Sequence, residues 1–427
     1  MYIKRLWCGF ALGLGLLLGL LWLLAGGGAP VRCEAARAAP LEGIQVCASG
    51  CAFASIQEAV DAATPGELIK VATGVYTDVH ARASVTQVVY ISKTVTVRGG
   101  YGDQFRQWNP DIYTTTLDAQ GQGRAIFISA VGASPVVEGF HIVGGDATGL
   151  GGDPWGGDAG GGIYVNVATP VISGNLIYGN AAYRGGGLFA NSPITLAGNV
   201  FIGNVAGSGG GLYLHGQPAS LEANVVVSNT ATTGDGGGIV LNASDTTLVN
   251  TVIADNRLDN ASRYGSGLYV YGASPRLLHT TVARNSGGDG SGIHVNDPGM
   301  PGTQSGVAMT NTIVASHTIG IVVTQRNTVT LNATLWHANT GGNWGGTGAI
   351  THTNDYSGDP AFVADATHPL DAQYPYHLTD DSAAIDRGVA AGVVTDLDGD
   401  ARPIGSGYDL GADEVPKRVY LPLVLRD

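Results

Sequence analysis

The chain has 427 residues and a formal net charge of −13, and only 13% of its residues are charged. Lysine is absent between Lys93 and Lys417, so the sequence offers no basic groove for nucleic acid, and a polyanionic sugar is disfavoured unless a cation bridges it. Glycine is abundant, at 67 residues without a collagen period, which suits tight turns between short strands.

The first 38 residues predict an export signal. Lys4 and Arg5 precede an apolar, uncharged run over 6–25, and Ala36-Arg37-Ala38 resembles a small-residue cleavage site. Cleavage there would release the protein outside the cell or at its surface. The run is also long enough to span a bilayer, so a retained anchor is the alternative, and it is the only membrane contact that the sequence predicts.

Cleavage would leave two cysteines, Cys47 and Cys51. An isolated pair in an exported chain predicts a small disulfide. The spacing by itself is weak evidence for a metal, and no partner histidine is nearby in the sequence. We therefore expect the two thiols to be joined.

Residues 39–124 predict an N-terminal cap followed by the first coils of a longer stack. Ser55 and Glu58 have the spacing of a capping box at the start of a short amphipathic helix, which ends before Pro65-Gly66. Such a helix would cover the open end of the first coil, which otherwise exposes core and strand edges. Its apolar stripe comprises Ile56, Ala59, Val60 and Ala63.

Regular coils are predicted over 125–345, because one short pattern recurs through the middle of this segment. Glycine triplets or Gly-Ser-Gly, each followed by an apolar residue, begin at positions 160, 185, 209, 236, 265 and 290. Two further β-rich runs follow in each repeat, with no helical period between them. A period of this length indicates a stacked repeat, so we predict an all-β solenoid with three strands per coil.

Alternation within the first strand of each repeat separates an inward from an outward set of side chains. The inward column is Ile163, Leu188, Leu212, Ile239, Leu268 and Ile293. The outward set is Tyr164, Phe189, Tyr213, Tyr269 and His294, with Asn166, Asn191, His215 and Asn242 beside them. These outward residues either pack across strands or form an exposed platform on which sugar rings stack. A third column, Asn175, Asn199, Asn224 and Asn250, is expected to bond backbone groups at successive corners.

The opening and the repeats resemble known families. The segments Ser55–Ala63, Pro65–Tyr76 and Lys93–Tyr101 resemble the start of right-handed parallel β-helix proteins of the pectate-lyase-like superfamily. Phe201-Ile-Gly-Asn204, before the triplet at Gly209, is similar to the repeats of polymorphic outer-membrane proteins. The resemblance implies a single right-handed parallel β-helix, a fold that hosts lyases, hydrolases, adhesins and structural proteins.

Residues 346–415 predict terminal coils and a C-terminal module, followed by a tail over 416–427. Within this part, 359–414 resembles the terminal module of surface β-helix proteins described as carrying a choice of anchor. The segment 396–400 is rich in oxygen ligands but departs from the twelve-residue calcium loop, so we predict a turn there. The tail is either a sorting signal or a strand that closes the stack.

Carboxylates that precede the glycine triplets are candidate catalytic groups. Asp235 and Asp289 stand two coils apart in one column, which also contains Arg184. Two strand spacings separate the backbones by about 10 Å, which is marginal for the roughly 6.5–9.5 Å between the carboxyl groups of an inverting glycosidase. The ordinary interpretation is an aspartate in a turn beside glycine.

A lyase would instead need a carboxylate cluster that binds a cation, together with a basic residue. The largest insertion, 144–159, supplies Asp146, Asp153 and Asp158, and Arg184 follows it. These residues are the candidate metal ligands, with calcium as the ion, although their spacing matches no known motif. No other cofactor is expected.

The sequence therefore predicts an exported or surface-attached β-helix protein. We expect it to bind a polysaccharide, a cell-surface glycan or another surface partner through its outward aromatic and asparagine face. A polysaccharide lyase or glycoside hydrolase is the alternative, and a purely structural surface protein is the third hypothesis.

Overall fold

The computed structural model describes residues 43–82, 85–363 and 376–415. The predicted export signal over 1–38 and the tail over 416–427 lie outside these residues. Within them, no helix has both the length and the apolar character needed to cross a membrane.

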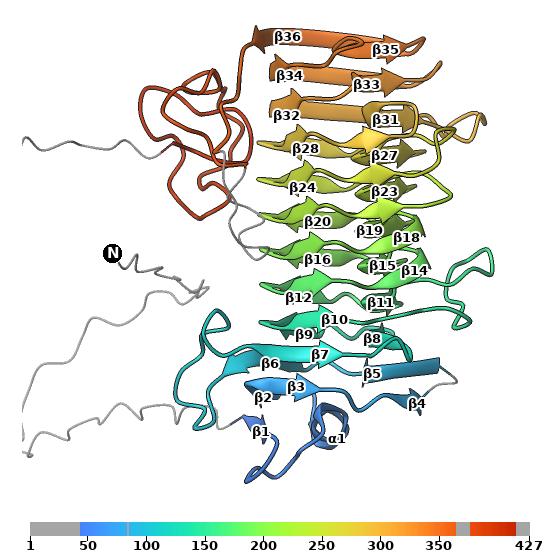
Figure 1. Cartoon of the computed structure of the whole chain (residues 1–427), viewed down its shortest axis with the longest axis vertical. Helices are drawn as coiled ribbons and strands as arrows, with labels where there is room; N and C mark the ends of the chain where they lie inside the picture. The colour runs from blue at the N-terminus through green and yellow to red at the C-terminus, as the bar shows by residue number, and fades with distance from the viewer. Residues whose placement is uncertain (1–42, 83–84, 364–375, 416–427) are drawn as a thin grey trace, which may run out of the picture. The chain divides into compact units, whose positions relative to one another are not determined.

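The N-terminal cap forms as the apolar stripe predicts. Helix α1 (Ile56–Ala62) buries Ile56, Ala59 and Val60 against the first coil, at the lower end of the stack in Figure 1. The capping box is wrong, because Ser55 makes no side-chain cap bond and its hydroxyl lies 3.1 Å from Asp78 Oδ2. Cys47 and Cys51 are joined by the predicted disulfide.

The described chain winds into coils whose strands form three parallel sheets (Figure 1). The second sheet contains β4 (His80–Arg82), β5 (Val85–Ile91), β8 (Arg124–Ser129), β11 (Ile163–Asn166), β15 (Leu188–Ala190), β19 (Leu212–His215), β23 (Ile239–Asn242), β27 (Leu268–Tyr271), β31 (Ser291–Asn296), β33 (Ile319–Val323) and β35 (Trp344–Gly346). Its first pairing, between β4 and β5, is antiparallel.

The first sheet takes two successive strands from most coils. The earlier strands are β1 (Ile44–Val46), β2 (Leu68–Ala72), β6 (Thr96–Tyr101), β9 (Val136–Glu138), β12 (Val171–Ser173), β16 (Ile194–Ala197), β20 (Ala219–Glu222), β24 (Thr247–Val249) and β28 (Arg276–Leu278). The later strands are β3 (Gly74–Tyr76), β7 (Thr115–Asp118), β10 (His141–Val143), β13 (Leu176–Tyr178), β17 (Val200–Ile202), β21 (Val225–Val227), β25 (Val252–Ala254) and β29 (Thr281–Ala283).

In the last coils the two strands merge into one long strand each. These strands are β32 (Gly306–Ala315), β34 (Thr328–His337) and β36 (Ala349–Ser357). A third, short sheet precedes the glycine triplets and contains β14 (Ala181–Arg184), β18 (Val205–Ser208), β22 (Thr230–Ala231), β26 (Arg257–Leu258) and β30 (Ser286–Gly287).

The inward column of the repeats forms the core, as predicted. Ile163 pairs with Leu188, Leu188 with Leu212, and the same register continues through Ile239, Leu268 and Ile293. All six side chains are fully buried. At about 1.5–3 kcal/mol for each buried aliphatic side chain, this column contributes strongly to the stability of the stack.

Two corners of the coil are held by ladders of asparagine side chains. In the first ladder, the backbone N and the Nδ2 of Asn175 both donate to Asn199 Oδ1, and Asn199 donates in the same way to Asn224. The second ladder repeats this pattern five residues later in each coil and comprises Asn180, Asn204, Asn229, Asn256 and Asn285, followed by His317. Each ladder satisfies buried backbone groups that the sheets leave unpaired.

The predicted place of Asn250 in the first ladder is wrong. Because Val225 pairs with Val252, the residue that follows Asn224 in the column is Thr251. Asn250 has the left-handed backbone conformation instead (φ 47°), and its Nδ2 donates to Thr395 O at 2.8 Å.

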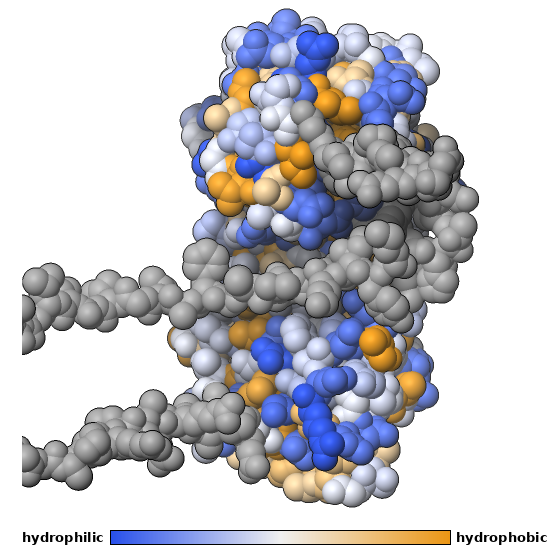
Figure 2. Space-filling view, turned by 90° about the vertical axis from the view of Figure 1, so that its left-hand side faces the viewer, coloured by the Kyte–Doolittle hydropathy of each residue, from blue (hydrophilic) through white to orange (hydrophobic). Residues whose placement is uncertain are grey.

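Residues 376–415, here called the C-terminal module, fold back against the side of the stack (Figure 1). The module covers outward apolar residues of β21, β25, β29, β32 and β34 with its own buried side chains, among them Leu378, Leu397 and Leu410. Asn311 fixes it through two bonds to the backbone of Val389, at 2.7 and 2.8 Å. On the face drawn in Figure 2, hydrophilic and hydrophobic residues are interspersed.

Loss of one ladder side chain should destabilise the protein. Asn204→Ala leaves the carbonyl of Ile177 without its Asn204 donor, and the backbone N of Asn180 without its acceptor. Buried polar groups without partners cost about 1–3 kcal/mol each, so we expect the free energy of unfolding to fall by about 3 kcal/mol in a denaturant titration. Asn260→Ala is the control, because Asn260 accepts only a local bond from Ser262, and a loss as large in the control would contradict the ladder.

The histidine in the second ladder should make stability depend on pH. Burial lowers the pKa of His317 to about 4, from 6.5 in the unfolded chain. The unfolded state therefore takes up the proton first, and stability that is present above pH 6.5 is lost as the pH falls toward 4.

We expect His317→Asn, which keeps a ladder amide, to reduce this loss by about 2 kcal/mol between pH 7 and 5. Urea titrations at the two pH values measure it, with the half-exposed His352→Asn as control. An unchanged pH dependence in His317→Asn would show that the ring does not titrate in this way.

Candidate functional site

The predicted exposed platform of aromatic rings is wrong. Tyr164, Phe189, Tyr213, Tyr269 and His294 are each exposed by 7% or less. The rings pack along the outer side of the second sheet: those of Phe189 and Tyr213 have centroids 5.5 Å apart and planes inclined by 23°. The column is therefore a second hydrophobic core, which matches the cross-strand packing alternative.

Loops before the glycine triplets cover these rings. The hydroxyl of Tyr164 donates to the carbonyl of Gly152 in the insertion at 2.7 Å. The guanidinium of Arg124 lies 4.7 Å from the Tyr164 ring centre and donates to the carbonyls of Gly151 and Ala159. Arg184 lies 5.7 Å from the ring centre of Tyr213.

The polar members of the predicted set lie at the rim of this core. Asn166, Asn191, His215 and Asn242 are all half-buried. Asn242 Nδ2 donates to the hydroxyl of Tyr213 at 2.9 Å. Asn191 Oδ1 and His215 Nδ1 are buried atoms for which the described residues provide no partner in hydrogen-bond geometry.

The charge state of His215 follows from its position. Burial lowers the pKa of its imidazole below 6.5, so the ring is neutral at pH 7. A neutral imidazole offers one donor and one acceptor, but His215 Nδ1 and Asn191 Oδ1 are both buried, so neither atom is open to a ligand in this structure.

The three candidate metal ligands of the insertion do not converge on a common point. Asp146 accepts the backbone N of Thr148, and Asp158 accepts those of Gly149 and Gly151. Asp153 accepts the backbone N of Trp155 and forms an ion pair with Arg184. These carboxylates stabilise the loop conformation, and the prediction of a cation cluster here is wrong.

The insertion instead builds an exposed aromatic patch that the sequence analysis missed. We define the Trp155 patch as Trp155, Tyr183, Arg184 and His215. Trp155 is 55% exposed and Tyr183 is 51% exposed. The Arg184 guanidinium lies 4.6 Å from the ring centre of Trp155 and 5.0 Å from that of Tyr183.

The indole of this patch also contacts the polar rim. The Trp155 ring packs edge-on against His215, with centroids 4.7 Å apart. The patch thus places two exposed aromatic rings beside the imidazole of His215. A tryptophan between two aspartates in the longest insertion was the available signal, but sequence did not show which column it covers.

The two candidate catalytic carboxylates lie in contrasting environments. His294 Nδ1 lies 2.8 Å from Asp289, and the Ser291 hydroxyl donates to the same carboxylate at 2.5 Å. Although burial opposes it, these bonds lower the pKa of Asp289. Burial raises the pKa of Asp235, and the negative charge of Asp289 adds to the effect.

Asp235 and Asp289 have neighbours that differ from those of Arg184, the third candidate catalytic residue. Asp235 Oδ1 accepts the backbone N of Tyr264 at 3.0 Å, and the Tyr264 ring lies 4.6 Å from that of His294. Arg184 is held by Asp153 and the aromatic rings of the Trp155 patch. Asp235 and Asp289 thus have neighbours that differ from those of Arg184, and the pKa of one carboxyl is raised while that of the other is lowered.

Comparisons with known proteins address the fold. The family model described as "Right handed beta helix region" matches residues 155–286, less than half of the chain. Among solved structures, pectate lyase Pel9A has a TM-score of 0.45 at 12% identity, covering 88% of this chain and 97% of that one. A rhamnogalacturonan lyase has a TM-score of 0.30 at 9% identity, covering 80% and 95%.

No curated protein sequence matches the chain significantly. The family match and the three parallel sheets identify the fold: this protein is a right-handed parallel β-helix.

Proposed function

We propose that this protein is exported and binds a polysaccharide or cell-surface glycan through the Trp155 patch. The observation that carries the proposal is the pair of half-exposed rings, Trp155 and Tyr183, whose centres lie 4.6 and 5.0 Å from the Arg184 guanidinium. Large exposed rings are costly to leave in water and are typical of binding surfaces. The disulfide between Cys47 and Cys51 fits an exported protein.

The chemistry of the patch favours a neutral sugar. Aromatic faces cover the apolar ring hydrogens of a sugar, and the imidazole of His215, which is neutral at pH 7, packs against Trp155 at the edge of the patch. The charge of Arg184 is neutralised by Asp153, and the chain carries a net charge of −13. An acidic polymer would therefore meet repulsion that the paired Arg184 does not offset.

A glycoside hydrolase is the second candidate, and the Asp235 and Asp289 pair favours it. Two carboxyls whose pKa values are pushed in opposite directions are what an acid and its partner base require. Asp235 would be the proton donor, and Asp289 would stay ionised. The lyase alternative loses its candidate site, because Asp146, Asp153 and Asp158 bond the backbone of their own loop.

Removal of the exposed indole should weaken glycan binding without destabilising the fold. For Trp155→Ala we expect a loss of about tenfold or more in affinity for a neutral polysaccharide, identified first on a glycan array. A loss of that size corresponds to about 1.4 kcal/mol. Calorimetric titration measures the affinity, and thermal unfolding checks that the variant folds.

Trp344→Ala is the matched control, because Trp344 is also exposed, at 40%, and packs against Trp336 and His352. Equal losses in both variants, or no loss in Trp155→Ala, would remove the Trp155 patch as the binding site.

The hydrolase candidate has a separate test. Asp235→Asn keeps an oxygen that can accept the backbone N of Tyr264, but it cannot donate a catalytic proton. We expect it to lower the hydrolysis rate by at least a hundredfold, measured by mass analysis of released sugars. If the unaltered protein releases no product from any glycan that it binds, the hydrolase candidate fails while the binding proposal stands.

A further inference from the structure

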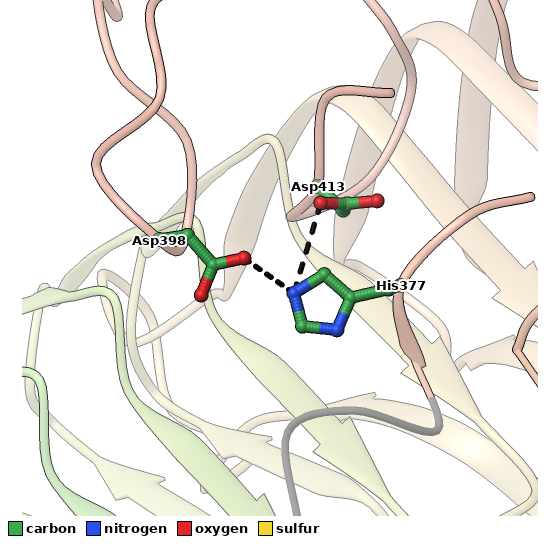
Figure 3. Close-up of side chains that lie close together, drawn as sticks. All are labelled: His377, Asp398 and Asp413. Carbon is green, nitrogen blue, oxygen red and sulfur yellow. Dashed lines mark hydrogen bonds and ion pairs between the residues drawn. The ribbon is translucent and has the colours of Figure 1, made fainter. Parts of the chain in front are cut away.

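We propose that His377, Asp398 and Asp413 form a binding site for a zinc-type divalent metal ion in the C-terminal module. The three side chains offer one ligand atom each, and these atoms all lie within 4.8 Å of one another. His377 Nε2 lies 2.5 Å from Asp398 Oδ2 and 3.8 Å from Asp413 Oδ1 (Figure 3). Among the residues that the structure describes, no other group of three or more such side chains converges in this way.

Asp413 is held in place as a ligand would be. Its side chain is only 4% exposed, and its Oδ2 accepts the backbone N of Leu378 at 2.7 Å. This bond fixes the carboxylate so that Oδ1 faces the ring nitrogen of His377, as Figure 3 shows. At 3.8 Å that approach is too long for a hydrogen bond.

Asp398 is positioned by a second carboxylate that does not belong to the site. Asp396 Oδ1 accepts the backbone N of both Asp398 and Asp400, at 2.9 and 2.8 Å. Its Oδ2 accepts the backbone N of Glu414 at 3.0 Å, next to Asp413. One buried side chain thus ties together the loop and the strand-like segment that carry the two acidic ligands, as outer residues do around metal sites.

Buried charge in the module is unbalanced without a cation. Asp396, Asp409, Asp413 and Glu414 are all buried, whereas Arg402 is the one buried arginine among the described residues of the module. Arg402 is committed to Glu414, with which it forms an ion pair at 2.7 Å. The buried aspartates accept bonds from backbone N–H groups but form no ion pair with any arginine that the structure describes, and a divalent ion at Asp413 and Asp398 would add positive charge to this acidic region.

The donor set indicates the kind of ion. One imidazole nitrogen and two carboxylate oxygens suit Zn²⁺, which takes four ligands and would leave one position for water. Calcium needs six to eight oxygen ligands, more than these three residues supply. The remaining histidine–aspartate pairs of the described chain, such as His352 with Asp355, hold one carboxylate each.

The site would join three separate segments of the module, which itself covers outward residues of β21, β25, β29, β32 and β34. Binding to the folded state alone shifts the unfolding equilibrium. Zinc should therefore stabilise the docked module and raise the unfolding temperature of the whole chain.

The test uses the untagged, EDTA-treated full chain. We expect it to bind one Zn²⁺ per molecule by elemental analysis and calorimetric titration, to unfold at a temperature several degrees higher with Zn²⁺, and to respond little to Ca²⁺. Asp398→Asn should weaken Zn²⁺ binding at least tenfold, because it changes a partly exposed ligand with little effect on packing. His377→Ala should abolish binding.

Asp400→Asn is the control on the same loop, two residues from Asp398 and exposed. Retained binding in Asp400→Asn, together with loss in Asp398→Asn, supports the site. The proposal is overturned if the unaltered protein binds no Zn²⁺, or if Asp398→Asn and His377→Ala both bind it as tightly as the unaltered protein.

Discussion

The stacking of asparagine side chains along two corners is the interaction on which the other features depend. A parallel coil must turn between strands, and the residue before each ladder asparagine adopts a left-handed conformation, as Gly174, Gly203 and Asp255 do. The turn leaves backbone groups without sheet partners, and the asparagines pair with them and, except at the end of each ladder, with the next asparagine. Because the bonds join successive coils, they fix the register that aligns every outward column.

The inward columns and most of the ladder were predictable because strand periodicity is strict. A residue such as Leu212 must be buried once the alternation is recognised, whatever lies outside. Exposure of Tyr213 was not predictable, because it depends on Arg184 and on an insertion whose path the repeat does not specify. The prediction that Asn250 follows Asn224 in the ladder was wrong for a related reason. Asn250 stands one residue before Thr251, and both are polar residues that suit a corner.

The C-terminal module docks where the residue type at the left-handed corner changes and where the strands become buried on both faces. The left-handed positions are Gly174 and Gly198 in the earlier coils, but Asn250, His279 and Asn311 in the coils that the module covers. The side chains of Asn250 and Asn311 bond the module directly, a contact that glycine could not make. The strands there, such as Val252–Ala254, are buried on both faces, and continuous apolar runs indicate such double burial.

The outer aromatic core links the two candidate sites on this side of the stack. Tyr213 packs beneath Arg184 of the Trp155 patch, and His294, which bonds Asp289, packs against Tyr269. A different buried ring therefore supports each site, Tyr213 the Trp155 patch and Tyr269 the carboxylate pair, so truncating either ring would disturb the site that it supports. Substitutions that test one site without disturbing the core beneath it must therefore be made at an exposed residue, such as Trp155, or at a side chain on a loop, such as Asp235.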